Sequence, residues 1–386
     1  MRTLVYGVGR SGEAAAARLA ERGDDVVLVD RKLGNEDDLD LLDGVDLLVK
    51  SPGAPPDAAI VRGARERGVP VWSEVELGFR LLPGTRFVGV TGTNGKTTTT
   101  ALLGAIFEAA GRDVAVAGNI GVPLTAVRSA HWVVCELSSF QLEDIHEFTC
   151  DVAVLLNLEP DNLDRYPSFD AYRDAKLRIF ERAGVRIVPR GLGLAGTEFS
   201  ADDPLPAEPL LRGAHNRENA SAATAAARAA GIDDAAIAEA LSSFAGVANR
   251  LELVREVDGV RFVNDSKATN VAAARKALEA YADEPVHLIL GGSLKGEDFG
   301  PLAASIGGNV RSIHLIGKAS DELAAALGDR AHFRDENLAS AVEHAARLAV
   351  PGDVVLLSPA CASYDQFRDF EHRGDEFRGL VYRLGS

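Results

Sequence analysis

Short apolar runs rich in β-branched residues alternate along this chain with longer, alanine-rich stretches. This alternation constrains the fold more than any other feature, because it is typical of βαβ units in which a helix connects two parallel strands. We therefore expect an α/β protein built on mostly parallel sheets. The predicted strands cover residues 4–6, 26–29, 47–49, 87–90, 132–135, 152–156, 287–290, 312–316 and 354–357.

The length of the chain and two breaks in its pattern of strands and helices predict more than one domain. The chain has 386 residues, whereas one ordinary domain has roughly 100–200, so two to three domains are expected. One break is the Leu-Pro-Gly sequence at residues 82–84. A second lies near residues 246–249, after an alanine-rich helix expected to start around Asn219. The predicted domains are residues 1–83, 84–246 and 247–386.

Composition excludes several classes of function. The chain has 41 basic and 57 acidic residues and a formal net charge of −16. Nucleic acid binding is not expected, because phosphate contacts require clustered Lys and Arg. Three widely spaced cysteines without a CxxC pair argue against a disulfide framework and a zinc site. With no long apolar run and a predicted strand close to Met1, we expect a cytoplasmic protein without membrane insertion, and a soluble monomer.

A glycine pattern, GVGRSG at residues 7–12, follows the first predicted strand, and Asp30 closes the next strand. This is the context of a dinucleotide-binding turn, in which glycines let a pyrophosphate approach the backbone at a helix N-terminus. NAD, another diphosphate nucleotide such as a UDP group, and a turn without a ligand all fit the pattern. The segment Ser51-Pro52-Gly53-Ala54 ends the third strand on the same edge, and its amides, other than that of Pro52, offer further backbone donors.

A second glycine-rich segment, GVTGTNGKTT at residues 89–98, follows a strand and opens a helix. It ends as a Walker loop does, although Val90 stands where the strict pattern has its first glycine. Backbone amides of residues 92–98 are expected to cradle phosphates, Lys96 to reach the β and γ oxygens, and the Thr97 hydroxyl to bind Mg²⁺. We expect ATP or GTP here, and a purely structural turn is the alternative.

Two further residues suit a nucleotide site that contains a metal ion. Glu136 ends a predicted strand at the sheet edge where ligands bind, and its carboxylate suits Mg²⁺; a surface glutamate that caps the strand is the alternative. Ser138 and Gln141 follow and are expected to line the same mouth. Lys176 lies among apolar residues of a predicted helix, residues 169–180. A buried neutral amine can react with CO₂ to give a carbamate that holds Mg²⁺, whereas an ordinary lysine would reach solvent.

Longer stretches between residues 89 and 374 are more specific: TGTNGKTTT, AGNIGVPL, ELSSFQLE, DRYPSFDAYRDAKLRIF, GAHNRENA, NDSKATN, GGSLKGEDF and SPACASYDQFRDFEHRG. They resemble the Mur ligase family, the ATP-dependent amino-acid-adding enzymes of peptidoglycan precursor synthesis, and most closely its D-glutamate-adding branch. The resemblance implies Rossmann-like first and third domains and a central P-loop ATPase-like parallel sheet. It also implies that ATP and Mg²⁺ activate the carboxylate of UDP-N-acetylmuramoyl-L-alanine as an acyl phosphate, which the amine of D-glutamate then attacks.

Carried over position by position, the resemblance implies a set of site residues. The catalytic residues would be Lys96, Glu136, Lys176, His215 and Arg250. ATP would be bound by Gly92, Thr93, Asn94, Gly95, Lys96, Thr97, Thr98, Thr99, Asn216, Asn219 and Asp265. Together with the first glycine pattern, the UDP-substrate site would comprise Gly9, Arg10, Ser11, Gly12, Asp30, Arg31, Ser51, Pro52, Gly53, Asn119, Ser138 and Gln141. D-Glutamate would be bound by Thr269, Lys295, Ser363 and Phe370. One or two Mg²⁺ ions would be held by Thr97, Glu136, carbamylated Lys176 and Asn162. Arg373 matches a family position whose role is left open.

The chain departs from the family pattern at several positions. Asn162 and Asn249 stand where histidine is usual. The amide oxygen of Asn162 can still bind Mg²⁺ directly or through water. Arg31 stands where some relatives carry a small hydroxyl residue, and the segment before Lys295 lacks a frequent acid. The chain is also shorter than typical members, and we expect the shortening within residues 181–214.

Three alternative functions remain open on the sequence. A ligase of the same build would add a different amino acid or act on folate. An NAD-binding oxidoreductase would explain residues 7–12 but leave residues 89–98 without a role, and a nucleotide sensor would bind ATP without amino-acid-dependent turnover.

Overall fold

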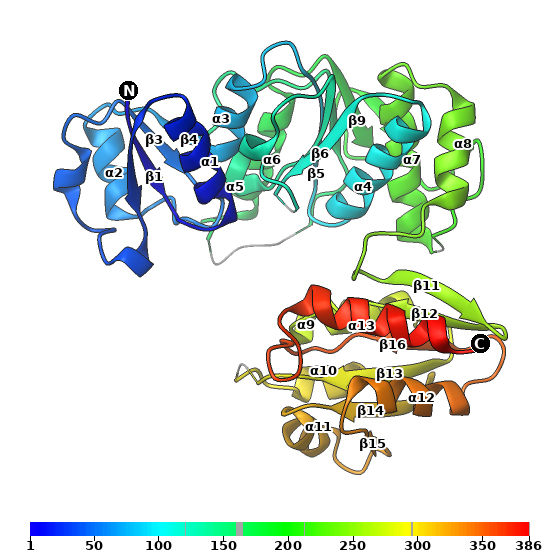
Figure 1. The fold of residues 1–386 in the computed structure, drawn as a ribbon. Helices are drawn as coiled ribbons and strands as arrows, with labels where there is room; N and C mark the ends of the chain where they lie inside the picture. The colour runs from blue at the N-terminus through cyan, green and yellow to red at the C-terminus, as the bar shows by residue number, and fades with distance from the viewer. Residues whose placement is uncertain (120, 160–164, 212, 295, 386) are drawn as a thin grey trace. The chain divides into compact units, whose positions relative to one another are not determined.

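The computed structural model describes residues 1–119, 121–159, 165–211, 213–294 and 296–385. The predicted site residues Asn162 and Lys295 lie outside the described residues. The chain divides into two compact units, Met1–Phe244 and Ala245–Ser386. In each unit helices pack against sheets of mostly parallel strands, so the predicted α/β class is confirmed (Figure 1).

The first sheet has the strand order β2-β1-β3-β4, and all its pairs are parallel. Side chains along β1 alternate between two apolar clusters. Leu4 and Tyr6 pack in one cluster, and Val5 packs in the other. The strands are β1 (Arg2–Tyr6), β2 (Asp25–Val29), β3 (Leu47–Lys50) and β4 (Val71–Ser73). The helices are α1 (Arg10–Glu21), α2 (Ala59–Glu66) and α3 (Glu74–Arg80), with 3₁₀ turns η1 (Arg31–Leu33) and η2 (Leu39–Leu42).

The second sheet lies in the same unit and has the order β10-β9-β8-β5-β7-β6, again with parallel pairs. Its strands are β5 (Arg86–Thr91), β6 (Val114–Gly118), β7 (Trp132–Glu136), β8 (Val152–Leu155), β9 (Val185–Pro189) and β10 (Thr197–Phe199). Its helices are α4 (Lys96–Ala109), α5 (Ser139–Leu142), α6 (Phe169–Leu177), α7 (Ala214–Ala229) and α8 (Asp234–Ser243), with 3₁₀ turns η3 (Leu124–Ala126) and η4 (Arg178–Phe180).

Both faces of the second sheet are covered, which explains why its central strands are largely apolar. Val88 and Val90 of β5 pack on the side of α4, α7 and α8. Phe87 points to the opposite face and packs in the cluster that includes residues of α3, α5 and η4. Figure 1 shows α4, α7 and α8 together beside this sheet.

The third sheet fills the second unit and has the order β11-β12-β16-β13-β14-β15. Its first pair is an antiparallel hairpin and its other pairs are parallel. The strands are β11 (Glu252–Val257), β12 (Val260–Asn264), β13 (Val286–Gly291), β14 (Val310–Ile316), β15 (Phe333–Arg334) and β16 (Val354–Leu357). The helices are α9 (Val271–Ala280), α10 (Gly300–Ser305), α11 (Ser320–Leu327), α12 (Leu338–Leu348) and α13 (Phe370–Arg383).

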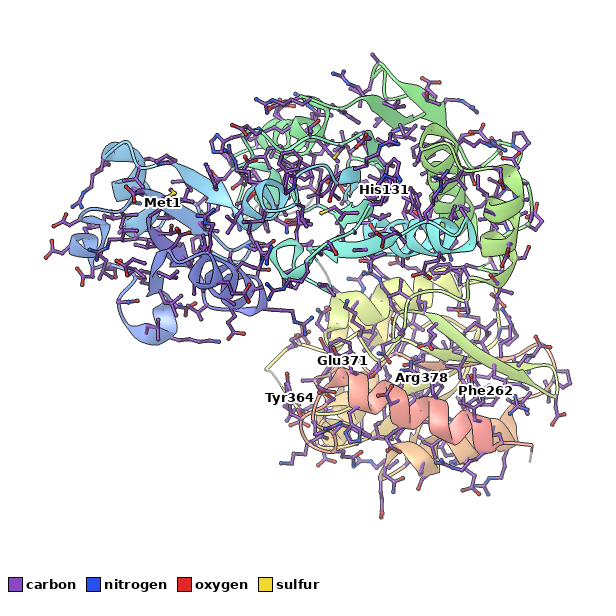
Figure 2. All side chains as sticks on the ribbon, turned by 45° about the horizontal axis from the view of Figure 1, so that its top comes forward. Met1, His131, Phe262, Tyr364, Glu371 and Arg378 are labelled. Atoms are coloured by element: carbon purple, nitrogen blue, oxygen red, sulfur yellow. The ribbon has the colours of Figure 1, made fainter. Side chains whose placement is uncertain are left out.

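The long helix α13 packs beside β11 and β12, and Figure 2 labels Arg378 on it and Phe262 on β12. Arg378 Nη1 donates a hydrogen bond to Glu252 Oε2 at 2.7 Å, which ties α13 to the hairpin.

All the predicted strands are present to within two residues at each end, but two helix predictions need correction. The helix expected to start around Asn219 begins at Ala214, because Gly213, with φ of 101°, makes the turn into it. The helix predicted over residues 169–180 is α-helical only to Leu177 and ends in a 3₁₀ turn. All three cysteines are buried free thiols, as expected. Among the described residues, no helix combines the length and apolar character needed to cross a membrane.

Candidate functional site

The carboxyl ends of β5, β6 and β7 meet at one edge of the second sheet. Glu136 pairs in register with Val90 on one side and with Gly118 on the other. Asn119, the residue after β6, donates its side-chain N–H to Glu136 Oε1 at 3.2 Å. Glu136 is 2% exposed, so the alternative of a surface cap is wrong. A buried, oriented carboxylate therefore lies at the edge where ligands bind in open α/β sheets.

The loop between β5 and α4 follows at this edge and needs its glycines. Gly92 and Gly95 have φ of 153° and 81°. A Cβ on Gly95 would lie 2.2 Å from Asn219 Oδ1, and one on Gly92 would lie 2.9 Å from Leu156 Cβ. The chain after β8 holds the loop, because Asn157 accepts hydrogen bonds from the amides of Thr93 (3.1 Å) and Asn94 (2.8 Å). The loop thus leads tightly into the N-terminus of α4, where first-turn amides point away from the helix.

Two lysine ammonium groups converge on this loop. Lys96 Nζ donates to the carbonyl oxygens of Gly92 and Thr93, both at 2.9 Å. Lys176 Nζ, from α6, donates to the same Gly92 oxygen at 2.7 Å and lies 4.8 Å from the centre of the Tyr172 ring. Lys176 is 2% exposed, so the alternative in which it reaches solvent is wrong. Two cationic side chains therefore contact the same carbonyl oxygen of the loop.

Several polar contacts at this loop were not predicted from the sequence. Tyr172 OH lies 3.1 Å from Thr93 Oγ1, and Asn94 Nδ2 donates to Glu159 Oε2 at 2.8 Å. Burial, with a smaller contribution from Glu159, raises the pKa of Glu218. The available signal was the run of polar and acidic residues after strand 152–155, at the same sheet edge as the loop.

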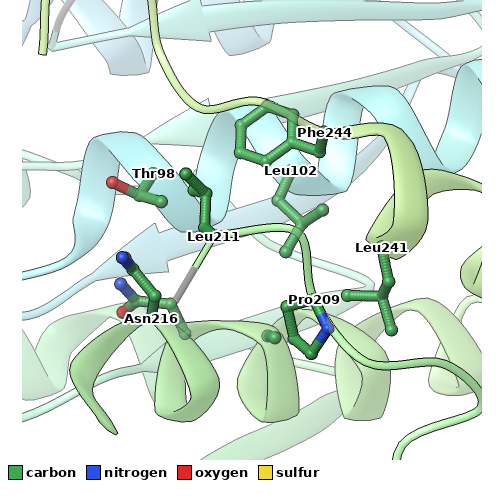
Figure 3. Close-up of a pocket in the computed structure, with 9 residues that line it drawn as sticks. Thr98, Leu102, Pro209, Leu211, Asn216, Leu241 and Phe244 are labelled. Atoms are coloured by element: carbon green, nitrogen blue, oxygen red, sulfur yellow. The ribbon is translucent and has the colours of Figure 1, made fainter. Parts of the chain in front are cut away.

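A small pocket lies beside the loop between α4 and α7 (Figure 3). Thr98 and Asn216 lie at one end of the view, and the apolar side chains of Leu241 and Phe244 lie farther along. Asn219 also lines the pocket and is buried. The full lining is Thr98, Leu102, Pro209, Leu211, Asn216, Asn219, Ala220, Leu241 and Phe244. Of the other predicted residues nearby, Thr97 and Thr99 are buried, and His215 is exposed in the first turn of α7.

Side chains that follow β2 and β3 hold the glycine-rich turn between β1 and α1. Ser51 Oγ donates to the Gly7 carbonyl at 2.6 Å. Asp30 accepts hydrogen bonds from the amides of Val8 at 2.6 Å and Lys32 at 2.8 Å. These two amides, that of Lys32 first, lower the pKa of Asp30. A Cβ on Gly12 would lie 1.9 Å from the Gly7 oxygen, so Gly12 is required for the close packing of α1 against the turn.

The other residues predicted for the UDP substrate lie around two sheet edges of the first unit. Arg10 is exposed and donates to the Gly121 carbonyl at 3.2 Å. Ser138 and Gln141 form a capping box at the start of α5, and the Gln141 side chain is buried. At the β1–β3 edge, Ser11 and Pro52 are partly buried, and Gly9, Arg31 and Gly53 are partly or fully exposed.

In the second unit, Asp265 and Asn249 lie close together in the chain segments around β12. Burial raises the pKa of Asp265 to about 7, although it accepts hydrogen bonds from Ser358 Oγ at 2.8 Å and the Leu251 amide at 3.2 Å. Asn249 has φ of 63°, a conformation that asparagine tolerates well, and its Oδ1 accepts from Asn264 Nδ2 at 2.9 Å. Asn249 therefore has a structural role where the sequence departs from the family, and the exposed Arg250 follows it.

The remaining residues predicted for D-glutamate surround a buried arginine. Thr269 is partly buried after β12, Ser363 is buried, and Phe370 starts α13. Arg373 is fully buried and donates to Ser266 Oγ at 2.9 Å and to the carbonyls of Ser266 (2.8 Å) and Cys361 (3.1 Å). Burial lowers the Arg373 pKa to about 10. The position whose role was left open thus connects the loops around Thr269 and Ser363.

Comparison with known proteins agrees with this arrangement. Residues 90–189 match the Mur ligase middle domain, and residues 249–361 match the glutamate ligase domain of Mur ligases. The chain is 42% identical to UDP-N-acetylmuramoylalanine–D-glutamate ligase of Anaeromyxobacter dehalogenans, over 98% of this chain and 97% of the relative. It is 40% identical to the enzyme of the same name from Geobacillus kaustophilus, over 99% of this chain and 98% of the relative.

The fold is shared with more distant solved structures. The crystal structure of UDP-N-acetylmuramate–alanine ligase from Thermotoga maritima superposes with a TM-score of 0.60 at 20% identity, covering 99% of each chain. The alignment with the Anaeromyxobacter relative runs over 450 positions, more than the 386 residues of this chain, so the relative contains segments that this chain lacks. Full-length identity at this level removes the oxidoreductase alternative, and the chain belongs to the Mur ligase family.

Proposed function

We propose that this protein is an ATP-dependent ligase that joins D-glutamate to UDP-N-acetylmuramoyl-L-alanine and releases ADP and phosphate, in peptidoglycan precursor synthesis. The identity of 42% over nearly the full length of a D-glutamate ligase supports the choice of substrates. The structural observation that carries the proposal is the convergence of Lys96 and Lys176 on the β5–α4 loop, at 2.9 and 2.7 Å from the Gly92 oxygen.

The chemistry explains why a cation at this loop matters. A carboxylate is a poor acylating agent, and its phosphorylation by ATP supplies a good leaving group for the attack by an amine. Two negative charges 4 Å apart repel each other by about 4 kcal/mol at an effective dielectric constant near 20. ATP and the substrate carboxylate therefore need positive groups between them, and Lys96 is placed to supply one.

The loop fits nucleotide phosphates. Gly92 and Gly95 adopt conformations that other residues disfavour, and they leave space for an anion to approach the amides at the start of α4. The candidate metal ligands, Thr97, Glu136 and a carbamate on Lys176, all offer oxygen atoms, which Mg²⁺ prefers. When bound, Mg²⁺ would neutralise charge on the phosphates. A carbamylated Nζ keeps one hydrogen, so the contact of Lys176 with Gly92 is compatible with the modification.

The remaining assignments are parts of the same proposal. The chain would form three domains, residues 1–83, 84–246 and 247–386, with Rossmann-like ends and a P-loop centre. The β1–α1 turn with Asn119 would bind the UDP substrate. The pocket lined by Asn216 and Asn219 would take part of ATP, together with His215, Arg250 and Asp265. Thr269, Ser363 and Phe370 would bind D-glutamate, and the protein would act as a monomer.

The decisive experiment is a phosphate-release assay with Mg-ATP and UDP-N-acetylmuramoyl-L-alanine. D-Glutamate, L-glutamate, L-lysine and meso-diaminopimelate are added one at a time, and the product is weighed by mass spectrometry. We expect release only with D-glutamate and a product heavier by one glutamyl residue. Release with another amino acid would move the protein to a different ligase of the family. Absence of release with all four, despite measurable ATP binding, would refute the ligase proposal.

A further inference from the structure

A line of hydrogen-bonded side chains crosses one face of the third sheet, among residues to which the proposed reaction assigns no role. His287 Nε2 lies 3.0 Å from Asp353 Oδ2, and His287 Nδ1 lies 2.7 Å from Ser312 Oγ. Ser312 Oγ lies 2.8 Å from His314 Nε2, and His314 Nδ1 lies 2.6 Å from Asp335 Oδ2. His287 and His314 are buried, so water does not complete these contacts from the surface.

Counting hydrogen atoms shows that this line of contacts is one hydrogen short. The four contacts between the Asp353 and Asp335 carboxylates need four hydrogen atoms. A neutral His287, the Ser312 hydroxyl and a neutral His314 supply one each, which makes three. If His287 donates to Asp353 and His314 donates to Ser312, the lone pair of His314 Nδ1 faces the Asp335 carboxylate. Either an extra proton or a metal ion must lie between these two atoms.

A second histidine makes the metal ion the better candidate. His344 Nδ1 lies 3.0 Å from Asp335 Oδ1, on the other side of the same carboxylate. Candidate ligand atoms of His314, Asp335 and His344 all lie within 4.8 Å of one another. The His314 side chain is fully buried, whereas that of His344 is 26% exposed. An ion could therefore enter from solvent past His344, and a water molecule could occupy a further coordination position.

We propose that His314, Asp335 and His344 bind one divalent transition-metal ion, such as Zn²⁺, through two imidazole nitrogens and one carboxylate oxygen. Imidazole and carboxylate ligands suit Zn²⁺ and its first-row neighbours. Ser312, backed by His287, fixes His314 Nε2 as a donor and leaves Nδ1 for the metal, which is the usual role of a partner behind a ligand. Tetrahedral bonds of about 2.05 Å place ligand atoms about 3.3 Å apart, so the contacts of 2.6 and 3.0 Å must open by about 0.7 and 0.3 Å. Any pair of ligand atoms near the 4.8 Å limit of the cluster must move closer together.

The position of the site indicates what the metal would do. His314 is on β14, Asp335 follows β15, and His344 is on α12. The edge strand β15 pairs with β14 through only two residues, and the Phe333 ring lies 5.3 Å from the His314 ring and 4.3 Å from the His344 ring. A bound ion would fasten this short edge strand to its neighbours. The site is independent of the proposed catalytic residues.

The test uses the full chain, stripped of metal with a chelator and titrated with Co²⁺, whose visible spectrum reports bound ligands, and then with Zn²⁺ alone. Wild type is compared with His344→Gln, Asp335→Asn and the matched control His332→Gln, which removes a partly buried histidine three residues before Asp335. We expect wild type and His332→Gln to bind about one ion per chain at this site, with a Co²⁺ absorption band and a melting temperature raised by Zn²⁺. Both signals are expected to be lost in His344→Gln and Asp335→Asn.

Other outcomes would overturn the proposal. If wild type shows no such Co²⁺ band, a proton and not a metal ion lies between His314 Nδ1 and Asp335 Oδ2, and the proposal is wrong. If His344→Gln keeps the band, the ion binds elsewhere, for example at the candidate Mg²⁺ ligands of the first unit. If both variants fail to fold, X-ray absorption of zinc-loaded wild type decides, because two imidazole ligands must be visible in its spectrum.

Discussion

Two turns of the first unit have the same plan and different surroundings. Both the β1–α1 turn and the β5–α4 loop lead from a parallel strand through glycines into a helix. In the first turn, Asp30 accepts from the Val8 amide and Ser51 donates to the Gly7 carbonyl. In the second, the side chains that reach the loop carbonyls are the ammonium groups of Lys96 and Lys176.

This difference shows that the backbone path of a turn and the charges around it have separate roles. Glycines fix the path of the backbone, which is similar for any diphosphate and even for an empty turn. The charged side chains around the turn decide which ligand and which reaction are favoured. Asp30 accepts hydrogen bonds from backbone amides and brings no positive charge to the β1–α1 turn, which suits that turn to binding a ligand without reacting with it. Lysines concentrated on the other loop make it suited to the transfer of a phosphoryl group.

The largest effect is expected from removing a charge at the β5–α4 loop. Lys96→Met should lower kcat of ATP-dependent ligation by about 10³-fold, because single electrostatic contacts to a transition state contribute roughly 10²–10³-fold. The matched control is Lys32→Met, which removes an exposed lysine beside the β1–α1 turn and should change kcat little. Phosphate release under saturating substrates measures both. Equal losses in the two variants would remove the distinction between the turns.

Substitution of Lys176 tests whether its positive charge or its ability to form a carbamate matters for activity. Lys176→Arg keeps a cation at the loop but cannot form a carbamate. We expect it to lose activity nearly as completely as Lys176→Ala, about 10²–10³-fold, since the lost group would hold the metal ion. Activity of the arginine variant close to that of wild type would show that only the positive charge matters. Initial rates, measured with and without added bicarbonate, distinguish the two cases.

In the β1–α1 turn the corresponding large effect is on stability. Gly12→Ala would place a Cβ 1.9 Å from the Gly7 oxygen, a backbone atom that cannot easily move. We expect it to lower the free energy of unfolding by about 3 kcal/mol, the upper range for overpacking. Gly9→Ala is the control, since among the described residues no heavy atom lies within 4 Å of a Cβ built there, and it should cost less than about 0.5 kcal/mol. Urea unfolding followed by circular dichroism compares the variants.

Much of the fold could be predicted because local signals and burial agree. Strands such as β7 and β16 are short, fully buried runs that are apolar apart from Glu136 at the end of β7, and their patterns have one interpretation. The hairpin β11–β12 was not predicted, because β11 is only partly buried and carries charged residues. Its signal was the pair Asp258-Gly259, with φ of 50° and 78°, which is the chemistry of a tight hairpin turn.

The site was predictable where a motif lies in one segment and was not where it is assembled from several. Residues 92–98 are contiguous from the β5–α4 loop into α4, so a single motif predicts that they lie together, although it does not predict their contacts with Asn157, Glu159 and Tyr172. The line from Asp353 through His287 and His314 to Asp335 joins four separate segments of the third sheet. Only pairing in register brings His287 beside Ser312, and no spacing along the sequence records that pairing.

The smallest predicted effect tests whether the Asp30 carboxylate stabilises the β1–α1 turn. Two backbone amides lower its pKa below the ordinary value of 3.8, so its contribution to stability is present above that value and is lost as the pH falls through the folded-state pKa. Asp30→Asn should therefore cost about 1 kcal/mol at neutral pH, as expected for a side chain that caps amides, and almost nothing in strong acid. Urea unfolding from neutral pH to about pH 2 measures the difference, with the exposed Asp37→Asn as control. A cost that does not change with pH would mean that the Asp30 carboxylate charge is not what holds the turn, and the contrast with the lysines of the β5–α4 loop would then rest on that loop alone.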